Sequence, residues 1–143
     1  MAQVLFVCVH NAGRSQMAKA LFNHLARQRG LPFRAESAGT QPAPHIHPTV
    51  AETMREVGID LSLEHPKALT DAMVRQAQRV IVMGCAVDTQ ACPAILLRDV
   101  EDWGLPDPKD LPLPQVRAIR DTVRQKVEAL LTQLEAEGAG QRV

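Results

Sequence analysis

The fold of this chain follows from one stretch near its N-terminus, Val4-Leu5-Phe6-Val7-Cys8-Val9-His10-Asn11-Ala12-Gly13-Arg14-Ser15-Gln16-Met17-Ala18. Residues 4–7 are an apolar run, which is the pattern of a buried strand. The stretch ends in a helical pattern that continues with Leu21, Phe22 and Leu25 on the same face. Between the two lies a short loop that starts with a cysteine and closes with an arginine after five intervening residues. The stretch therefore predicts a strand that turns directly into a helix.

A loop of this kind is a binding site for an anion. A strand that turns into a helix directs backbone N–H groups and the positive end of the helix at one point. A cysteine at a strand end is usually part of the core, but Cys8 experiences this field, which favours its thiolate and lowers its pKa. Arg14 adds a planar charged fork suited to a tetrahedral oxyanion, and we expect it to be loosely packed and to face the ligand. The small residues Ala12 and Gly13 let the backbone wrap closely around that ligand.

Three polar residues of the stretch have further candidate roles. Asn11 tolerates a left-handed backbone conformation and can bond neighbouring loop groups, so we expect it to shape the loop. Ser15 can donate its hydroxyl to the Cys8 sulfur or cap the helix. His10 either raises the local positive potential or is an ordinary exposed histidine, and both interpretations stay open at this point.

These residues carry a family resemblance. Cys8 to Ser15, followed by Gln16-Met17-Ala18, resembles the active-site loop of low-molecular-weight protein tyrosine phosphatases, and more closely that of the arsenate reductases built on that fold. The resemblance extends from about Val4 to Leu134 and implies that Cys8 is the nucleophile. It also implies that Ser37 supports Asn11. The substrate-binding residues that it implies are Val9, His10, Asn11, Ala12, Gly13, Arg14 and Ser15.

The length and charge of the chain limit what else it does. We expect one domain over residues 1–143, with a frayed tail at 138–143. Sixteen Lys and Arg residues balance sixteen Asp and Glu residues, which gives no support for binding to nucleic acid or to a membrane surface. The sequence contains neither a long apolar span nor a signal-like N-terminus. We therefore expect a cytoplasmic protein, and a monomer.

Apolar strands alternate with amphipathic helices along the chain. This pattern predicts an α/β fold with a four-stranded parallel sheet and helices on both faces. Ligands of such sheets bind beyond the carboxyl ends of the strands, where Cys8 follows the first strand and Cys85 follows the third. The expected strands are residues 4–7, 33–37, 80–83 and 95–97, and the expected helices are residues 15–29, 48–58, 70–77 and 113–136.

The other two of the three cysteines, Cys85 and Cys92, are separated by six residues. Zinc knuckles use shorter spacings, so a zinc site is a weak interpretation, and the alternatives are two inert thiols or a redox pair that can approach Cys8. The pair resembles the two redox cysteines of the thioredoxin-coupled arsenate reductases, which show the same spacing. The resemblance implies a relay of Cys8, Cys85 and Cys92 that is regenerated by reduced thioredoxin and needs no cofactor.

Asp107-Pro108 is the remaining candidate element. An isolated loop aspartate is usually only solvated, but here the pair resembles the general-acid loop of the family, in which the acid protonates the departing oxygen. The phosphatases usually continue with tyrosine, whereas this chain has Lys109 and contains no tyrosine, which argues against a tyrosyl-phosphate substrate. Some reductases bind a potassium ion near the loop with a glutamate ligand. Lys19 stands at that place, so no metal is predicted.

The expected function is reduction of arsenate to arsenite in arsenic detoxification. The alternative is a phosphomonoester hydrolase of the low-molecular-weight phosphatase type, and a third possibility is an oxyanion-binding or redox-sensing module without catalysis. Phosphate and arsenate are nearly isosteric, so weak phosphatase activity is expected even of a reductase.

Overall fold

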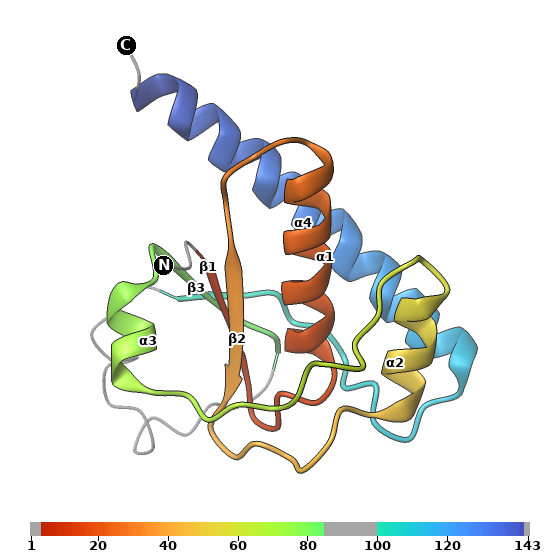
Figure 1. Ribbon diagram of the computed structural model, residues 1–143. Coiled ribbons are helices and arrows are strands. Elements are labelled where there is room, and N and C mark those ends of the chain that lie inside the picture. Colours follow the sequence, from red (N-terminus) through yellow and green to blue (C-terminus); the bar gives the residue numbers. More distant parts are fainter. Residues whose placement is uncertain (1–3, 85–99, 142–143) are drawn as a thin grey trace.

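A parallel β-sheet forms the centre of the molecule (Figure 1). In the computed structural model, which describes residues 4–84 and 100–141 and side chains as far as Glu137, the sheet has four strands in the order β2-β1-β3-β4. Every pairing is parallel, and Cys8 lies opposite Gly39. The carboxyl ends of β1, β2 and β3 therefore meet at one edge of the sheet. The strands are β1 (Val4–Cys8), β2 (Ala35–Gly39), β3 (Arg79–Val82) and β4 (Val100–Asp102).

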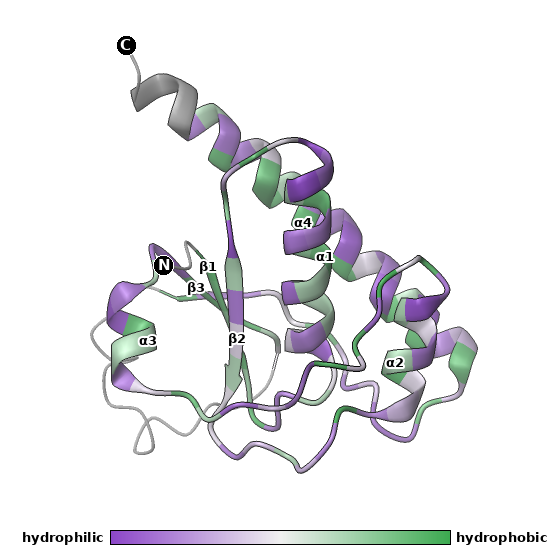
Figure 2. Ribbon diagram, viewed as in Figure 1, coloured by the Kyte–Doolittle hydropathy of each residue, from purple (hydrophilic) through white to green (hydrophobic). Residues whose placement is uncertain are grey.

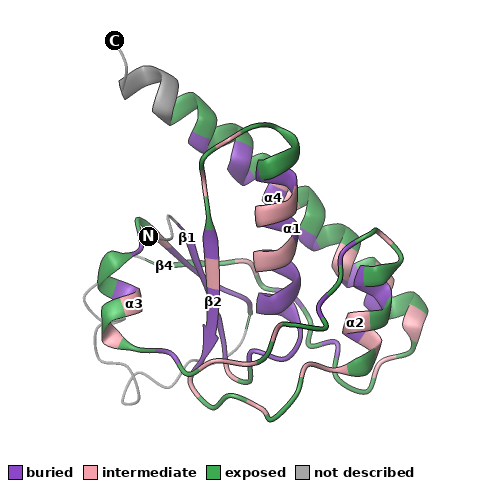
Figure 3. Ribbon diagram, in the orientation of Figure 1, coloured by how far each residue is buried: buried purple, intermediate pink, exposed green. Residues whose placement is uncertain are grey.

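Helices cover both faces of the sheet, so the predicted α/β fold class is confirmed. All five residues of β1 are buried, because alternate side chains of a strand point to opposite faces and both faces are covered (Figure 3). Phe6 and Cys8 pack on the side of α1, α2 and α4, and Leu5 and Val7 on the side of α3. The helices are α1 (Arg14–Gln28), α2 (Pro48–Arg55), α3 (Asp71–Gln76) and α4 (Leu113–Gln141).

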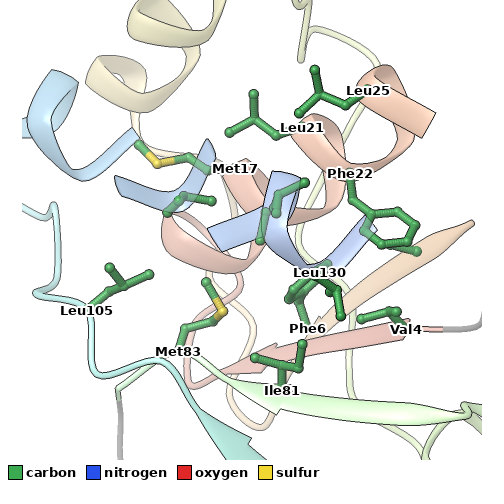
Figure 4. Packing of buried hydrophobic residues seen from close by; sticks show 14 of the residues in the cluster. Val4, Phe6, Met17, Leu21, Phe22, Leu25, Ile81, Met83, Leu105 and Leu130 are labelled. Carbon is green, nitrogen blue, oxygen red and sulfur yellow. The ribbon is translucent and has the colours of Figure 1, made fainter. Parts of the chain in front are cut away.

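The larger core holds the site in place. Figure 4 shows side chains of α1, among them Met17 and Phe22, packed over Phe6, Ile81 and neighbouring side chains of the sheet. The rings of Phe6 and Phe22 meet edge to face with their centroids 6.2 Å apart. Leu105, which is buried, belongs to the same cluster and so anchors the segment that leads to Asp107. In Figure 2 the hydrophilic sides of α1 and α4 alternate with hydrophobic ones, as expected of helices with one buried face.

Local signals mark the ends of three helices. Gly30 follows α1 with a positive φ of 67°, as a C-terminal cap glycine does, and Pro48 is the first residue of α2. The Thr70 hydroxyl oxygen accepts the Met73 N–H at 3.2 Å and caps α3. No helix of the described residues is long and apolar enough to cross a membrane.

Other boundaries differ from the prediction. The second strand is Ala35–Gly39 rather than 33–37, because its bounds follow the pairing with β1 and not the apolar character of Phe33. The described fourth strand is Val100–Asp102, whose three residues are all exposed and give no apolar signal, and residues 95–97 lie outside the described residues. The last helix continues to Gln141, so the backbone of 138–141, expected as part of a frayed tail, is helical.

Candidate active site

The Cys8 loop, residues 9–13, curls around the sulfur of Cys8 at the end of β1. Cys8 is 4% exposed, and its Sγ accepts the backbone N–H of Asn11 at 3.1 Å. The Ser15 hydroxyl lies 2.8 Å from the same sulfur. Asn11 has a φ of 51°, in the left-handed region that asparagine tolerates, and this turns its N–H back toward the sulfur. The prediction that Asn11 shapes the loop agrees with this geometry.

A chain of hydrogen bonds holds the Ser15 hydroxyl beside the Cys8 sulfur. The Lys67 backbone N–H donates to Asn11 Oδ1 at 2.9 Å, so the other end of that carboxamide, Nδ2, must face Ser15. Asn11 Nδ2 then donates to Ser15 Oγ at 2.7 Å. The serine oxygen accepts this bond and keeps its own proton, which it can donate to the Cys8 sulfur. Donation from this hydroxyl and from the Asn11 N–H favours the thiolate over the thiol.

The start of α1 supplies further positive potential. The helix begins at Arg14, its N-cap residue Gly13 makes no side-chain cap, and its first turn contains no acidic residue. The positive end of the helix therefore points at the Cys8 loop without a side-chain anion to neutralise it. This arrangement suits a bound oxyanion.

Arg14 differs from the prediction that it is loosely packed. The residue is only 8% exposed, and its Nη1 donates to the carbonyl oxygen of Leu105 at 2.7 Å. Its Nη2 lies 3.9 Å from Asp107 Oδ2. The guanidinium is held because five donors in one plane can reach a backbone carbonyl and still present further N–H groups. Arg14 thus joins the Cys8 loop to the Asp107 loop, residues 103–110.

The Asp107 loop lies against the Cys8 loop. A Cβ placed on Gly13 would lie 2.7 Å from Pro108 Cγ, so only glycine permits this approach. The Asp107 side chain is half exposed, and its Oδ1 accepts the Lys109 N–H at 3.0 Å. The carboxylate is therefore at the rim of the site and beside Arg14, where a proton donor to a departing oxygen has to lie.

The same loop is in contact with the end of β3. Gly84 has a positive φ of 84°, and a Cβ on it would lie 2.5 Å from the backbone nitrogen and 2.7 Å from the carbonyl oxygen of Leu105. That carbonyl is the one that accepts from Arg14. Gly84 is the last described residue before Cys85, and both predicted redox cysteines, Cys85 and Cys92, lie outside the described residues.

Other predicted site residues have varied positions. His10 is exposed, and its Nδ1 lies 3.0 Å from the carbonyl oxygen of Gln41, so this nitrogen carries the proton. Ser37 is buried on β2 opposite Phe6, whereas the bonds to Asn11 Oδ1 come from Lys67 and from Gln16 Nε2 at 3.1 Å. Within the described part of the chain, no three His, Cys, Asp or Glu side chains are grouped to hold a metal ion.

His47 is a site residue that the sequence analysis missed. Its backbone N–H donates to the carbonyl oxygen of Ala12 at 3.0 Å, and its ring carbon Cδ2 would lie 3.4 Å from a Cβ on Gly13. Burial lowers the pKa of His47, and the negative charge of Asp107 offsets only part of this effect. The local sequence gives no signal for this position, because the contact joins His47 to Ala12, more than thirty positions away.

Comparison with known proteins agrees with this geometry. Residues 3–140 match the family described as low molecular weight phosphotyrosine protein phosphatase. A protein of Halobacterium salinarum named putative arsenate reductase is 40% identical over 124 residues, which cover 85% of each chain. A protein of Synechocystis named glutaredoxin arsenate reductase is 32% identical over 94% of this chain and 99% of its own length.

Solved structures give the same result. A structure described as an arsenate reductase in the phosphate binding state has a TM-score of 0.78 and 31% identity, and the match covers 93% of this chain and 98% of that one. A thioredoxin-dependent arsenate reductase of Corynebacterium glutamicum has a TM-score of 0.73 and 35% identity over 96% of this chain and 63% of its own. The resemblance inferred from the Cys8 motif is confirmed. The chain belongs to the low molecular weight phosphotyrosine protein phosphatase family, and relatives similar to it over most of its length are named arsenate reductases.

Proposed function

We propose that this chain reduces arsenate to arsenite, with Cys8 as the nucleophile and a thiol relay that thioredoxin regenerates. The observation that carries the proposal is the Cys8 sulfur, which receives the Asn11 N–H at 3.1 Å and lies 2.8 Å from the Ser15 hydroxyl inside a loop closed by Arg14. This geometry supports attack of a thiolate on a bound oxyanion. The names of the relatives and the presence of Cys85 and Cys92 support reduction over hydrolysis.

The first step forms a bond between sulfur and arsenic. Backbone N–H groups of residues 9–15 and the guanidinium of Arg14 hold three arsenate oxygens. The Cys8 thiolate attacks arsenic while Asp107 gives a proton to the fourth oxygen, the hydroxyl of hydrogen arsenate, which leaves as water. Arg14, 3.9 Å from the Asp107 carboxylate, keeps that carboxyl next to the substrate.

The later steps transfer two electrons. The Cys85 thiolate attacks the Cys8 sulfur, the electron pair of the S–As bond stays on arsenic, and arsenite departs as a disulfide joins Cys8 and Cys85. Cys92 then attacks Cys85 and releases the Cys8 thiolate. The dithiol of thioredoxin reduces the remaining Cys85–Cys92 disulfide and is itself oxidised. The roles of Cys85 and Cys92 rest on their spacing and on a relative that is named a thioredoxin-dependent arsenate reductase.

Phosphomonoester hydrolysis is the second candidate function. The family name supports it, and the same Cys8, Arg14 and Asp107 would carry it, with water regenerating the nucleophile. Lys109 after Asp107-Pro108 and the lack of tyrosine weigh against a tyrosyl-phosphate substrate. We expect weak hydrolysis of small aryl phosphates beside the reduction.

The deciding experiment measures both reactions on one preparation. Arsenite release is followed with thioredoxin, thioredoxin reductase and NADPH, and in parallel with glutaredoxin and glutathione, because one relative is named for glutaredoxin. Aryl-phosphate hydrolysis is measured beside it, and Cys8→Ser is the control for both. Sustained arsenite release with thioredoxin supports the proposal. We expect the reaction to take place in the cytoplasm. Hydrolysis without arsenite release under either reductant would overturn it.

A further inference from the structure

A largely enclosed ammonium lies behind the Cys8 loop, on the side of α1 that faces β2. Lys19 Nζ is 3.1 Å from Glu36 Oε1 and 3.0 Å from Glu64 Oε2, and the Lys19 side chain is only 13% exposed. Burial opposes its charge, but the hydrogen bonds to Glu64 and Glu36 outweigh that effect and raise the pKa of Lys19. The ammonium therefore ties α1 both to β2 and to the segment 64–67.

The segment 64–67 is also what holds the nucleophile loop. The Lys67 N–H donates to Asn11 Oδ1 at 2.9 Å, and the His65 carbonyl oxygen accepts from Gln16 Nε2 at 3.2 Å. Gln16 Nε2 also donates to the carbonyl oxygen of Asn11 at 3.1 Å. The segment is thus bonded to Gln16 through the His65 carbonyl and to Asn11 through the Lys67 N–H.

A second ion pair closes the arrangement. Lys67 Nζ lies 3.0 Å from Glu36 Oε1, the same oxygen that faces Lys19. Lys19, Glu36, Glu64 and Lys67 therefore form a four-membered cluster of two cations and two anions, which we call the Lys19 cluster. Exposed ion pairs contribute little, but Lys19 is largely enclosed and bridges two different elements, so its loss frees both of them.

We propose that Lys19 is a positioning residue for the nucleophile. By fixing Glu64 and Glu36 it holds the segment 64–67 where the Lys67 N–H orients the Asn11 carboxamide, and that carboxamide turns the Ser15 hydroxyl to Cys8. Lys19 touches neither substrate nor sulfur in this scheme. The inference rests on the proposed role of Cys8 as nucleophile, but it requires neither arsenate nor thioredoxin.

A simpler explanation is that the Lys19 charge acts on the thiolate through space. The two explanations predict opposite changes in the thiol pKa when Glu64 is removed. Removal of Lys19 raises the thiol pKa in both, because a cation is lost and the segment is released. Removal of Glu64 deletes a negative charge, which through space would lower the thiol pKa. If Glu64 instead acts with Lys19 to hold the segment, its removal raises the thiol pKa.

The test uses a chain in which Cys85→Ala and Cys92→Ala leave Cys8 as the remaining cysteine, so that alkylation rate against pH reports one thiol. We expect Lys19→Met and Glu64→Ala each to raise the midpoint by about one pH unit, which lowers the thiolate fraction roughly tenfold at a pH well below both midpoints. Lys19→Arg, which keeps the cation, should raise the midpoint less than Lys19→Met does.

Two controls separate positioning from charge and from stability. Arg124→Met removes a cation of an exposed ion pair on α4 and should leave the midpoint unchanged. Ile119→Val lowers the stability of the core and should leave it unchanged as well, with urea unfolding measured for every variant. A lower midpoint in Glu64→Ala, or an unchanged midpoint in a folded Lys19→Met, would overturn the inference. Absence of arsenite release would overturn the proposed function and leave this measurement valid.

Discussion

Arg14 donates a hydrogen bond from Nη1 to the carbonyl oxygen of Leu105, with the two atoms 2.7 Å apart. The arginine that is expected to bind the oxyanion is therefore also the residue that fastens the Asp107 loop. We therefore expect binding of the substrate and placement of the proposed proton donor to depend on one guanidinium, because its planar fork lies between the Cys8 loop and the Asp107 loop.

Arg14→Lys tests this double role. We expect aryl-phosphate turnover to fall about a hundredfold or more, because the variant keeps a charge but loses the two-pronged donor. The unfolding free energy should also fall by about 1 kcal/mol, since the Leu105 carbonyl loses its buried partner. Urea denaturation and steady-state kinetics measure the two effects. Normal turnover in the variant would show that Arg14 does not clamp the oxyanion.

The sulfur of Cys8 should titrate below the value of an ordinary thiol, which is about 8.5. Ser15→Ala removes the donor that lies 2.8 Å from the sulfur and should raise the midpoint of alkylation against pH. Ser62→Ala, at an exposed serine, is the matched control. Phosphate should protect Cys8 from alkylation in the parent protein. A midpoint at or above 8.5 with no protection would contradict the oxyanion site.

Gly13→Ala should separate the general acid from the nucleophile. The added Cβ would lie 2.7 Å from Pro108 Cγ and displace the Asp107 loop. Protonation matters most for a poor leaving group, so turnover of phenyl phosphate should fall about tenfold more than turnover of 4-nitrophenyl phosphate. Pro108→Ala in the same chain removes the clashing atom and should restore part of the difference. Equal losses for both substrates would rule out this role for the close approach.

Cys92→Ser distinguishes reduction from hydrolysis. Cys92 is required only to resolve the Cys8–Cys85 disulfide, so the variant should hydrolyse aryl phosphate nearly as the parent does. With arsenate it should release about one arsenite per chain and then stop, and peptide mass mapping should find Cys8 joined to Cys85. The parent, once oxidised, should show Cys85 joined to Cys92. Sustained thioredoxin-dependent turnover by the variant would disprove the three-cysteine relay.

His47 should make stability depend on pH in a defined window. Its pKa in the folded chain is lowered from the usual 6.5, so the unfolded chain takes up this proton first as the pH falls. The contribution of His47 to stability is therefore complete above pH 6.5 and is lost as the pH falls from 6.5 through the lower folded value. His47→Gln should flatten the unfolding free energy across this window, and His45→Gln, at an exposed position of the same segment, is the control. An unchanged slope would exclude His47 as its origin.

The part of the site that could be predicted consists of residues that lie close together in the sequence. Cys8, Asn11 and Ser15 follow one another across a strand, a loop and a helix start, so local patterns place them together. The residues that complete the site come from far along the chain, as Lys67, Leu105 and His47 do. Their contacts depend on how the sheet edge is assembled, and no local pattern encodes them.

The error over Arg14 has the same origin. From the sequence, an arginine at the end of an anion-binding loop is expected to be loosely packed, because its partner is expected to be the ligand. The Leu105 carbonyl that buries it belongs to a segment ninety-one positions away. The described fourth strand, Val100–Asp102, was not predicted for a different reason, since its three residues are exposed and form no apolar run.

The backbone approach of Gly84 to Leu105 has a thermodynamic consequence. Gly84 directly precedes Cys85 in the chain and lies against the backbone of Leu105. The carbonyl oxygen of Leu105 also accepts the hydrogen bond from Arg14. We therefore expect an oxyanion bound by Arg14 and a disulfide formed at Cys85 to act on the same backbone group, the carbonyl of Leu105. Linkage is reciprocal, so any effect of the redox state of the thiols on the affinity for the anion is matched by an effect of equal free energy of the anion on that redox state.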